Sequence, residues 1–179
     1  MRLLTLAGLT AALSAVLAAP PALARAIPDP HQKPAPGNEA PQTPIAQAGY
    51  SAATNYQLQC LGCHLSSGEG APRTGTPKMV GFVGNFLRVE GGREFLVRVP
   101  GVSASALSDA QIAELLNWIL DPQHGMAGAS TPSDFRPYNA AEIAEVRHRA
   151  LLNRPGVRAG LIARMREQGI AIDDGMGQP

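Results

Sequence analysis

The chain has 179 residues, and its 15 lysines and arginines nearly balance its 14 aspartates and glutamates, giving a formal net charge of +1. A near-neutral chain lacks the basic footprint of a nucleic-acid-binding protein, so we expect no nucleic-acid partner. Aromatic residues make up only 4% of the sequence, which limits the apolar volume available for a core. The length predicts one domain with an appended segment.

The first 24 residues have the pattern of an export signal. Arg2 supplies a positive start, residues 3–19 are apolar, and residues 22–24 (Ala-Leu-Ala) fit a small-x-small cleavage site. The apolar run is short for a bilayer span. We therefore expect a Sec-type signal peptide and a periplasmic protein, which would be attached to a membrane only if the signal is left uncleaved. The proline-rich stretch 25–46 predicts an extended leader.

The two cysteines of the chain, Cys60 and Cys63, are followed at once by His64. C-x-x-C-H is the attachment signal of c-type haem. Its thiols add to the two vinyl groups, and the imidazole binds the iron from one face. We therefore expect one covalently attached haem c, bound by Cys60, Cys63 and His64.

Two other interpretations of these cysteines are weaker. A C-x-x-C disulfide in an exported protein normally lies in a thioredoxin-like βαβ pattern, and no such pattern surrounds Cys60 and Cys63. A zinc site would need two further ligands at metal spacing, and the other three histidines are isolated in the sequence. Neither alternative explains the histidine that directly follows the second cysteine.

Helical periodicity without any clear alternating strand pattern predicts an all-α fold. The strongest amphipathic pattern begins at Ser108, where Gln111 completes a capping box, and it ends at Asp121. The other long helices are expected over residues 48–61, 139–153 and 155–169. Shorter elements are expected around residues 77–87 and 93–99.

Residues 48–122 resemble a class I monohaem cytochrome c. In that family a helix ends at C-x-x-C-H, a Pro-x-Leu-x-Gly loop follows, and a last helix packs against the first. The resemblance implies that the carbonyl of Pro77 accepts a hydrogen bond from His64, and that Tyr56 contacts Trp118. It also divides the chain into a signal peptide (1–24), a leader (25–46), a cytochrome c domain (47–124) and a C-terminal helical extension (125–179).

The resemblance breaks at the second axial ligand of the iron. Val99 stands where the family commonly has a methionine before a proline, and valine cannot bind iron. We name Met79 as the candidate ligand and keep Met126, His124 and an open or water-ligated iron as alternatives. Arg93 is the candidate partner of a haem propionate, because a buried carboxylate needs a cation or hydrogen bonds.

The class implied by these features is a non-enzymatic electron carrier. A periplasmic dehydrogenase is the expected donor, and an oxidase or another cytochrome is the expected acceptor. The alternative is a haem protein with an open iron site, which binds small ligands or acts as a peroxidase-like enzyme. A third hypothesis makes the haem structural and assigns a binding function to residues 125–179.

Overall fold

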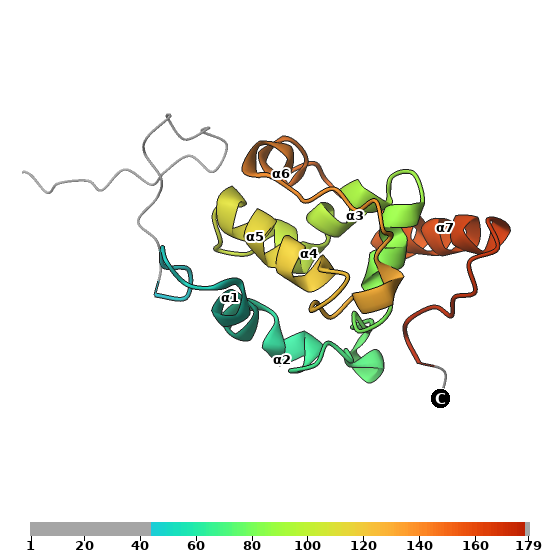
Figure 1. The fold of residues 1–179 in the computed structure, drawn as a ribbon, viewed down its shortest axis with the longest axis horizontal. Coiled ribbons are helices and arrows are strands. Elements are labelled where there is room, and N and C mark those ends of the chain that lie inside the picture. The colour runs from blue at the N-terminus through green and yellow to red at the C-terminus, as the bar shows by residue number, and fades with distance from the viewer. Residues whose placement is uncertain (1–43, 178–179) are drawn as a thin grey trace, which may run out of the picture. The chain divides into compact units, whose positions relative to one another are not determined.

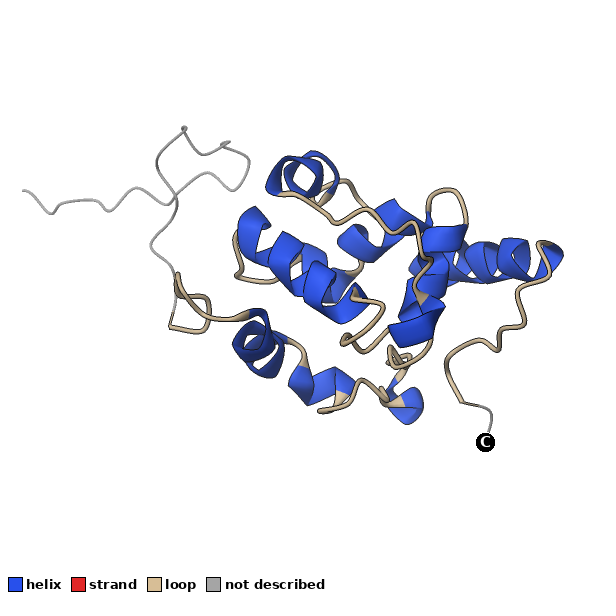
Figure 2. Ribbon diagram, in the orientation of Figure 1, coloured by secondary structure: helices blue, strands red, loops and turns tan. Residues whose placement is uncertain are grey.

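A computed structural model describes residues 44–177, and the expected signal peptide and most of the leader lie outside this range. The described chain is helical and contains no strand, which confirms the all-α class (Figure 1, Figure 2). Across residues 44–177, no helix is both long and apolar enough to span a bilayer. The helices are α1 (Ala52–Gln59), α2 (Leu61–His64), α3 (Gly92–Arg98), α4 (Pro100–Ser103), α5 (Asp109–Leu120), α6 (Ala140–Val146) and α7 (Arg154–Glu167), with the short 3-10 helices η1 (Pro72–Thr74), η2 (Val83–Arg88) and η3 (Gly128–Ser130).

The start of α5 is fixed by the capping box that the sequence predicts. The Ser108 side chain accepts from the Gln111 backbone at 3.3 Å, and the Gln111 side chain accepts from the Ser108 backbone at 2.9 Å. The reciprocal bonds satisfy two N–H groups that the first turn leaves without helical partners. The apolar stripe that follows is buried, and its members are Ile112, Leu115, Leu116, Ile119 and Leu120.

Helix α6 is shorter than the sequence predicts. It ends at Val146, whereas the expected helix runs to residue 153. The next residue, Arg147, is only 6% exposed. Its guanidinium donates to the carbonyls of Ser105 and Leu107 and pairs with the Asp109 carboxylate at 3.0 Å. A buried guanidinium must find several acceptors, and here they lie just before α5 and at its first residue, so Arg147 ties the end of α6 to the start of α5.

The extension shares its core with the rest of the described chain. Helix α6 packs on α5 and α3, and α7 packs on η2. Ile143 of α6 and Met165 of α7 are fully buried in the same hydrophobic cluster as Tyr56 of α1. Asn117 of α5 also exchanges two hydrogen bonds with the backbone of Tyr138, which lies just before α6, at 3.0 and 2.7 Å. The packing is therefore continuous across residue 124, and the boundary expected there stays a prediction.

An ion-pair network at Glu142 joins α3 to α6. Arg93 donates to both carboxylate oxygens of Glu142, and Arg136 approaches the same carboxylate at 3.2 Å. The hydrogen bond from Arg93 is the main reason that the pKa of Glu142 lies below its ordinary value of 4.5. The side chain of Glu142 is only 23% exposed, so solvent screens the network weakly.

We expect Glu142→Gln to lower the free energy of unfolding at pH 7 by roughly 1.5–3 kcal/mol, the range for hydrogen bonds to charged groups. A carboxylate with a lowered pKa stabilises the fold above its unfolded pKa and loses that contribution as the pH falls through its folded pKa. The gap between wild type and variant should therefore close below pH 4.5. Denaturant unfolding at several pH values measures it. Glu145→Gln on the same helix breaks an exposed pair with Arg149 and should change stability by less than about 1 kcal/mol; equal effects would contradict the prediction.

Candidate haem site

The two cysteines lie in one helical turn. Helix α1 ends at Gln59, Cys60 leaves the helical region at φ −121°, and α2 then carries Cys63 and His64. The backbone N–H of Cys63 donates to the Cys60 carbonyl at 3.1 Å, so the thiols stand about one turn apart on one side of the chain. Both thiols are free; Cys60 is half-buried and Cys63 is exposed. Burial, with a smaller contribution from Cys63, raises the pKa of Cys60 to about 11.

The imidazole of His64 is half-buried and held neutral. Burial lowers its pKa, and the backbone carbonyl of Pro77 opposes that shift as a hydrogen-bond acceptor. The Nδ1 atom of His64 is buried without a hydrogen-bond partner among the described residues, and the Pro77 carbonyl lies near enough to the imidazole to act on its pKa. A neutral imidazole that donates its Nδ1 proton to a carbonyl keeps Nε2 as the metal-binding atom, and a buried Nδ1 with the Pro77 carbonyl nearby fits this role for an axial histidine.

The loop after His64 folds back to bring Pro77 to the histidine. The Gly70 backbone donates to the His64 carbonyl at 3.1 Å, and Gly70 has φ +75°. A Cβ atom on Gly70 would stand 2.5 Å from the Pro77 carbonyl oxygen. A residue without a side chain is therefore required at position 70 for Pro77 to reach this place.

These features fit a haem. The chain offers two thiols on one turn, a neutral imidazole directly after them, and a buried Nδ1 atom that has no other partner. Large apolar side chains are exposed beside the motif, namely Leu58, Leu61 and Leu65, at 45%, 36% and 46%. An apolar group attached to Cys60 and Cys63 would therefore adjoin apolar neighbours. No group of three His, Cys, Asp or Glu side chains forms a metal site within residues 44–177, so the zinc alternative finds no ligand set there.

Tyr56 links α1, α5 and the haem-binding turn. Its ring is 2% exposed and contacts Trp118 with a centroid distance of 5.6 Å and an interplanar angle of 52°, which confirms the predicted pair. Its hydroxyl also donates to the carbonyl of Leu65 at 2.6 Å, a bond that the sequence analysis missed. Burial raises the pKa of Tyr56 to about 12, so this hydroxyl remains a donor at neutral pH.

We expect Tyr56→Phe to lower the free energy of unfolding by about 1 kcal/mol, because the ring contact stays while the Leu65 carbonyl loses its donor. The midpoint of denaturant unfolding measures the change. Tyr50→Phe is the control, since its hydroxyl makes only a 3.4 Å contact with the Pro44 carbonyl, and we expect a change below about 0.5 kcal/mol. Equal midpoints for wild type and Tyr56→Phe would show that the Leu65 bond contributes nothing.

Met79 and Met126, two candidates for the second axial ligand, meet at Gly68. The Met79 backbone donates to the Gly68 carbonyl at 2.6 Å, and the Gly81 backbone donates to the Met126 carbonyl at 2.8 Å. A Cβ atom on Gly68 would lie 3.0 Å from the Met126 sulfur and 3.4 Å from the Met79 Cβ. Both methionines thus lie against the loop that follows His64, and both pack on the core. Core packing accounts for both side chains, and iron ligation by Met79 stays a prediction.

His124 and Arg93, the other candidates, have partners of their own. The His124 side chain is 83% exposed, and its Nδ1 lies 3.6 Å from the Asp121 carboxylate. The guanidinium of Arg93 donates hydrogen bonds to the Glu142 carboxylate and to the carbonyls of Arg136 and Pro137. It also stacks over the Tyr138 ring, with 3.8 Å between its Cζ atom and the ring centroid. Its role toward a propionate therefore stays a prediction, and one that would require these bonds to be exchanged.

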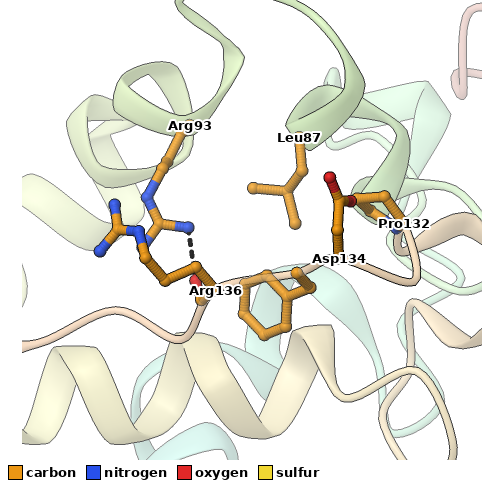
Figure 3. A pocket seen from close by; sticks show the side chains of 6 residues that line it. Leu87, Arg93, Pro132, Asp134 and Arg136 are labelled. Atoms are coloured by element: carbon orange, nitrogen blue, oxygen red, sulfur yellow. Dashed lines mark hydrogen bonds between the residues drawn. The ribbon is translucent and has the colours of Figure 1, made fainter.

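Arg93 also borders a small hollow of about 180 Å³, shown in Figure 3. The dashed line in the figure marks the bond from Arg93 to the carbonyl of Arg136. None of the haem-binding residues lines this hollow. Its lining residues are Leu87, Arg93, Pro132, Asp134, Phe135 and Arg136.

The fold and the site together define a helical protein with one C-x-x-C-H turn suited to haem. The chain is 32% identical over 111 residues to cytochrome c-552 of Thermus thermophilus, covering 52% of this chain and 82% of that protein. A second cytochrome c-552, from a particular strain of the same species, matches at the same identity of 32% over 72% of its length. The chain therefore belongs to the c-type cytochromes, proteins of electron transfer, and its cofactor is covalently bound haem c. No family model and no solved structure matches it.

Proposed function

We propose that this c-type cytochrome is an exported electron carrier, which takes single electrons from a periplasmic dehydrogenase and passes them to an oxidase or another cytochrome. The observation that carries the proposal is the turn of Cys60, Cys63 and His64, with a neutral imidazole directly behind two free thiols. The bound haem supplies one-electron redox chemistry at its iron. The protein's own residues fix the position of the haem, since two thioether bonds and one axial histidine prevent the haem from dissociating.

Export is supported by the pattern of residues 1–24. A covalently attached cofactor suits that location, because a haem held only by contacts could be lost outside the cytoplasm. Cys63, Leu61 and Leu65 lie at the surface of the chain, which supports a haem attached close to the protein surface. A partner docked on this surface would come close to the cofactor, which is what transfer between two proteins requires.

A second candidate function is binding of small ligands at an open iron site. It is favoured by the stretch from Val99 to Ser108, which connects α3 to α5 and contains no methionine, histidine, lysine or cysteine. It is favoured also by the position of Met79 and Met126 beside Gly68, on the loop of the axial histidine. A carrier with two axial ligands keeps small molecules away from its iron, whereas an open site admits them.

One set of measurements on the haem-loaded protein tests both candidates. Cell fractionation should place the haem-stained chain in the periplasm, and a periplasmic dehydrogenase with its substrate should reduce it in a concentration-dependent manner. The ferrous protein is then titrated with carbon monoxide. A carrier with two axial ligands binds carbon monoxide slowly or incompletely, while rapid and complete binding favours the open site. Failure of every dehydrogenase and cytochrome tested to exchange electrons would overturn the carrier proposal.

A further inference from the structure

The C-terminal tail, residues 169–177, returns from α7 to the loop that presents Pro77 to the axial histidine (Figure 1). The backbone N–H of Lys78 donates to the carbonyl of Gly175 at 2.8 Å. The side chain of Lys78 pairs with Asp173 at 2.9 Å. Two separate bonds therefore tie the tail to one residue of the haem-binding loop, and the ion pair between them spans 95 positions of the sequence.

The Lys78 N–H and the Pro77 carbonyl belong to the same peptide group. A trans peptide is planar, so its N–H and its carbonyl point in opposite directions, and the described chain contains no cis peptide. The N–H side of this peptide faces Gly175, and its carbonyl side reaches His64. A hydrogen bond to the N–H fixes the rotation of the whole group and polarises the carbonyl, which becomes a stronger acceptor.

The tail is itself held in place and can act as a support. The Asp173 carboxylate accepts from the Gly175 backbone at 2.6 Å. Arg158 of α7 donates to the Asp174 carbonyl and stacks over the Phe82 ring, with 5.6 Å between its guanidinium carbon and the ring centroid. Gly175 is buried. The segment thus has a fixed shape where it meets Lys78.

We propose that residues 173–175 position the axial histidine of this cytochrome. The tail holds the peptide between Pro77 and Lys78 so that its carbonyl faces Nδ1 of His64. This carbonyl sets the ring orientation and how strongly the imidazole donates to the iron. On the other side of the same peptide, the missing side chain of Gly70 leaves room for the carbonyl. The inference rests on His64 as an iron ligand but not on the identity of the redox partners.

Gly175→Ala tests the support without changing a residue of the haem-binding loop. A Cβ atom at position 175 would lie 2.7 Å from the ring of Phe82, which is 3% exposed and has no room to yield. We therefore expect the tail to shift and to lose its bond to Lys78. Gly177→Ala is the matched control, because its φ of +62° is close to the +68° of Gly175, while its new Cβ would stand 3.6 Å from Pro72, an ordinary contact. Both variants carry similar backbone strain, and only Gly175→Ala displaces the tail.

The measurement is solvent exchange of the His64 Nδ1 proton, followed by NMR on the haem-loaded ferrous protein, with carbon monoxide added where the iron has an open site. We expect exchange at least about tenfold faster in Gly175→Ala and in a chain ended after Gln168, with Gly177→Ala like the wild type. The reduction potential should rise in Gly175→Ala, because a weaker carbonyl acceptor leaves the imidazole a poorer donor to ferric iron.

Unchanged Nδ1 exchange in both Gly175→Ala and the shortened chain would overturn the inference, and so would an equal increase in Gly177→Ala. Gly175→Ala that does not fold leaves the shortened chain as the deciding variant. Reduction by ascorbate and by the dehydrogenase is measured on the same samples. Normal electron exchange, together with an Nδ1 proton that neither Gly175→Ala nor the shortened chain affects, refutes the support alone. A chain with the expected Nδ1 behaviour and no redox partner refutes the carrier proposal alone.

Discussion

Replacement of both Cys60 and Cys63 by serine is expected to abolish covalent haem attachment. Each thiol forms one thioether with a haem vinyl group, and the described chain offers no other cysteine. The double variant should lose all haem staining on a denaturing gel. Each single variant should retain one thioether at most, and its pyridine haemochrome band should shift toward that of haem with an unreacted vinyl group.

Ser67→Ala is the control for the cysteine variants, because Ser67 is exposed and lies on the same loop four residues after Cys63. It removes one side-chain atom, a change as small as Cys→Ser, and should leave haem content and the haemochrome band unchanged. Haem that stays with the double variant after denaturation would contradict the assignment of these two thiols. The experiment also separates attachment from folding, since circular dichroism shows whether the haem-free chain keeps its helices.

Features formed by residues close together in the sequence were predictable from the sequence. The haem-binding turn needs only Cys60, Cys63 and His64 in order, and the capping box needs only Ser108 and Gln111 three residues apart. Both are local codes in which the residues that interact are separated by a single turn of helix. The apolar stripe of α5 belongs to the same kind, because helical periodicity alone places its members on one face.

Long-range partners were not predictable in the same way. Arg93 was expected near a propionate, yet its guanidinium meets Glu142, 49 residues later. The tie between Lys78 and the tail spans 95 residues. Charged and backbone groups are common along the chain, and which of them meet is decided by how the extension wraps around α5, α3 and η2. No spacing in the sequence encodes that path.

The contact between Tyr56 and Trp118 lies between these cases. It spans 62 residues and was expected only because of the likeness to class I cytochromes c, where the first and last helices cross. The structure confirms the contact, and it adds the bond from the Tyr56 hydroxyl to Leu65. The second axial ligand shows the limit of the same likeness, because Val99 breaks the family pattern and no local signal replaces it.

Gly92→Ala is expected to lower the free energy of unfolding by about 3 kcal/mol or more, the upper range for overpacking a core. A Cβ atom on Gly92 would stand 1.8 Å from the carbonyl oxygen of Phe86, which is backbone and has no way to rotate aside. The clash lies where η2 meets α3, beside the stacked rings of Phe86 and Phe95, whose centroids are 5.1 Å apart. A chain of this size should melt roughly 6–12 °C lower, which differential scanning calorimetry measures.

Gly91 and Gly101 make this prediction specific. Gly91 has φ +79° with nothing within 4 Å of its Cβ position, so alanine there costs only the backbone strain of about 1 kcal/mol. Gly101 in α4 has neither a positive φ nor a close neighbour, and alanine there should be neutral or stabilise by less than about 1 kcal/mol. The order of melting temperatures should therefore be Gly101→Ala highest, then Gly91→Ala, then Gly92→Ala. If Gly92→Ala has the same melting temperature as the other two variants, η2 and α3 do not approach each other as closely as the structure shows. Helix α7 packs on η2, so the surface that supports the C-terminal tail against Lys78 would then be less well fixed.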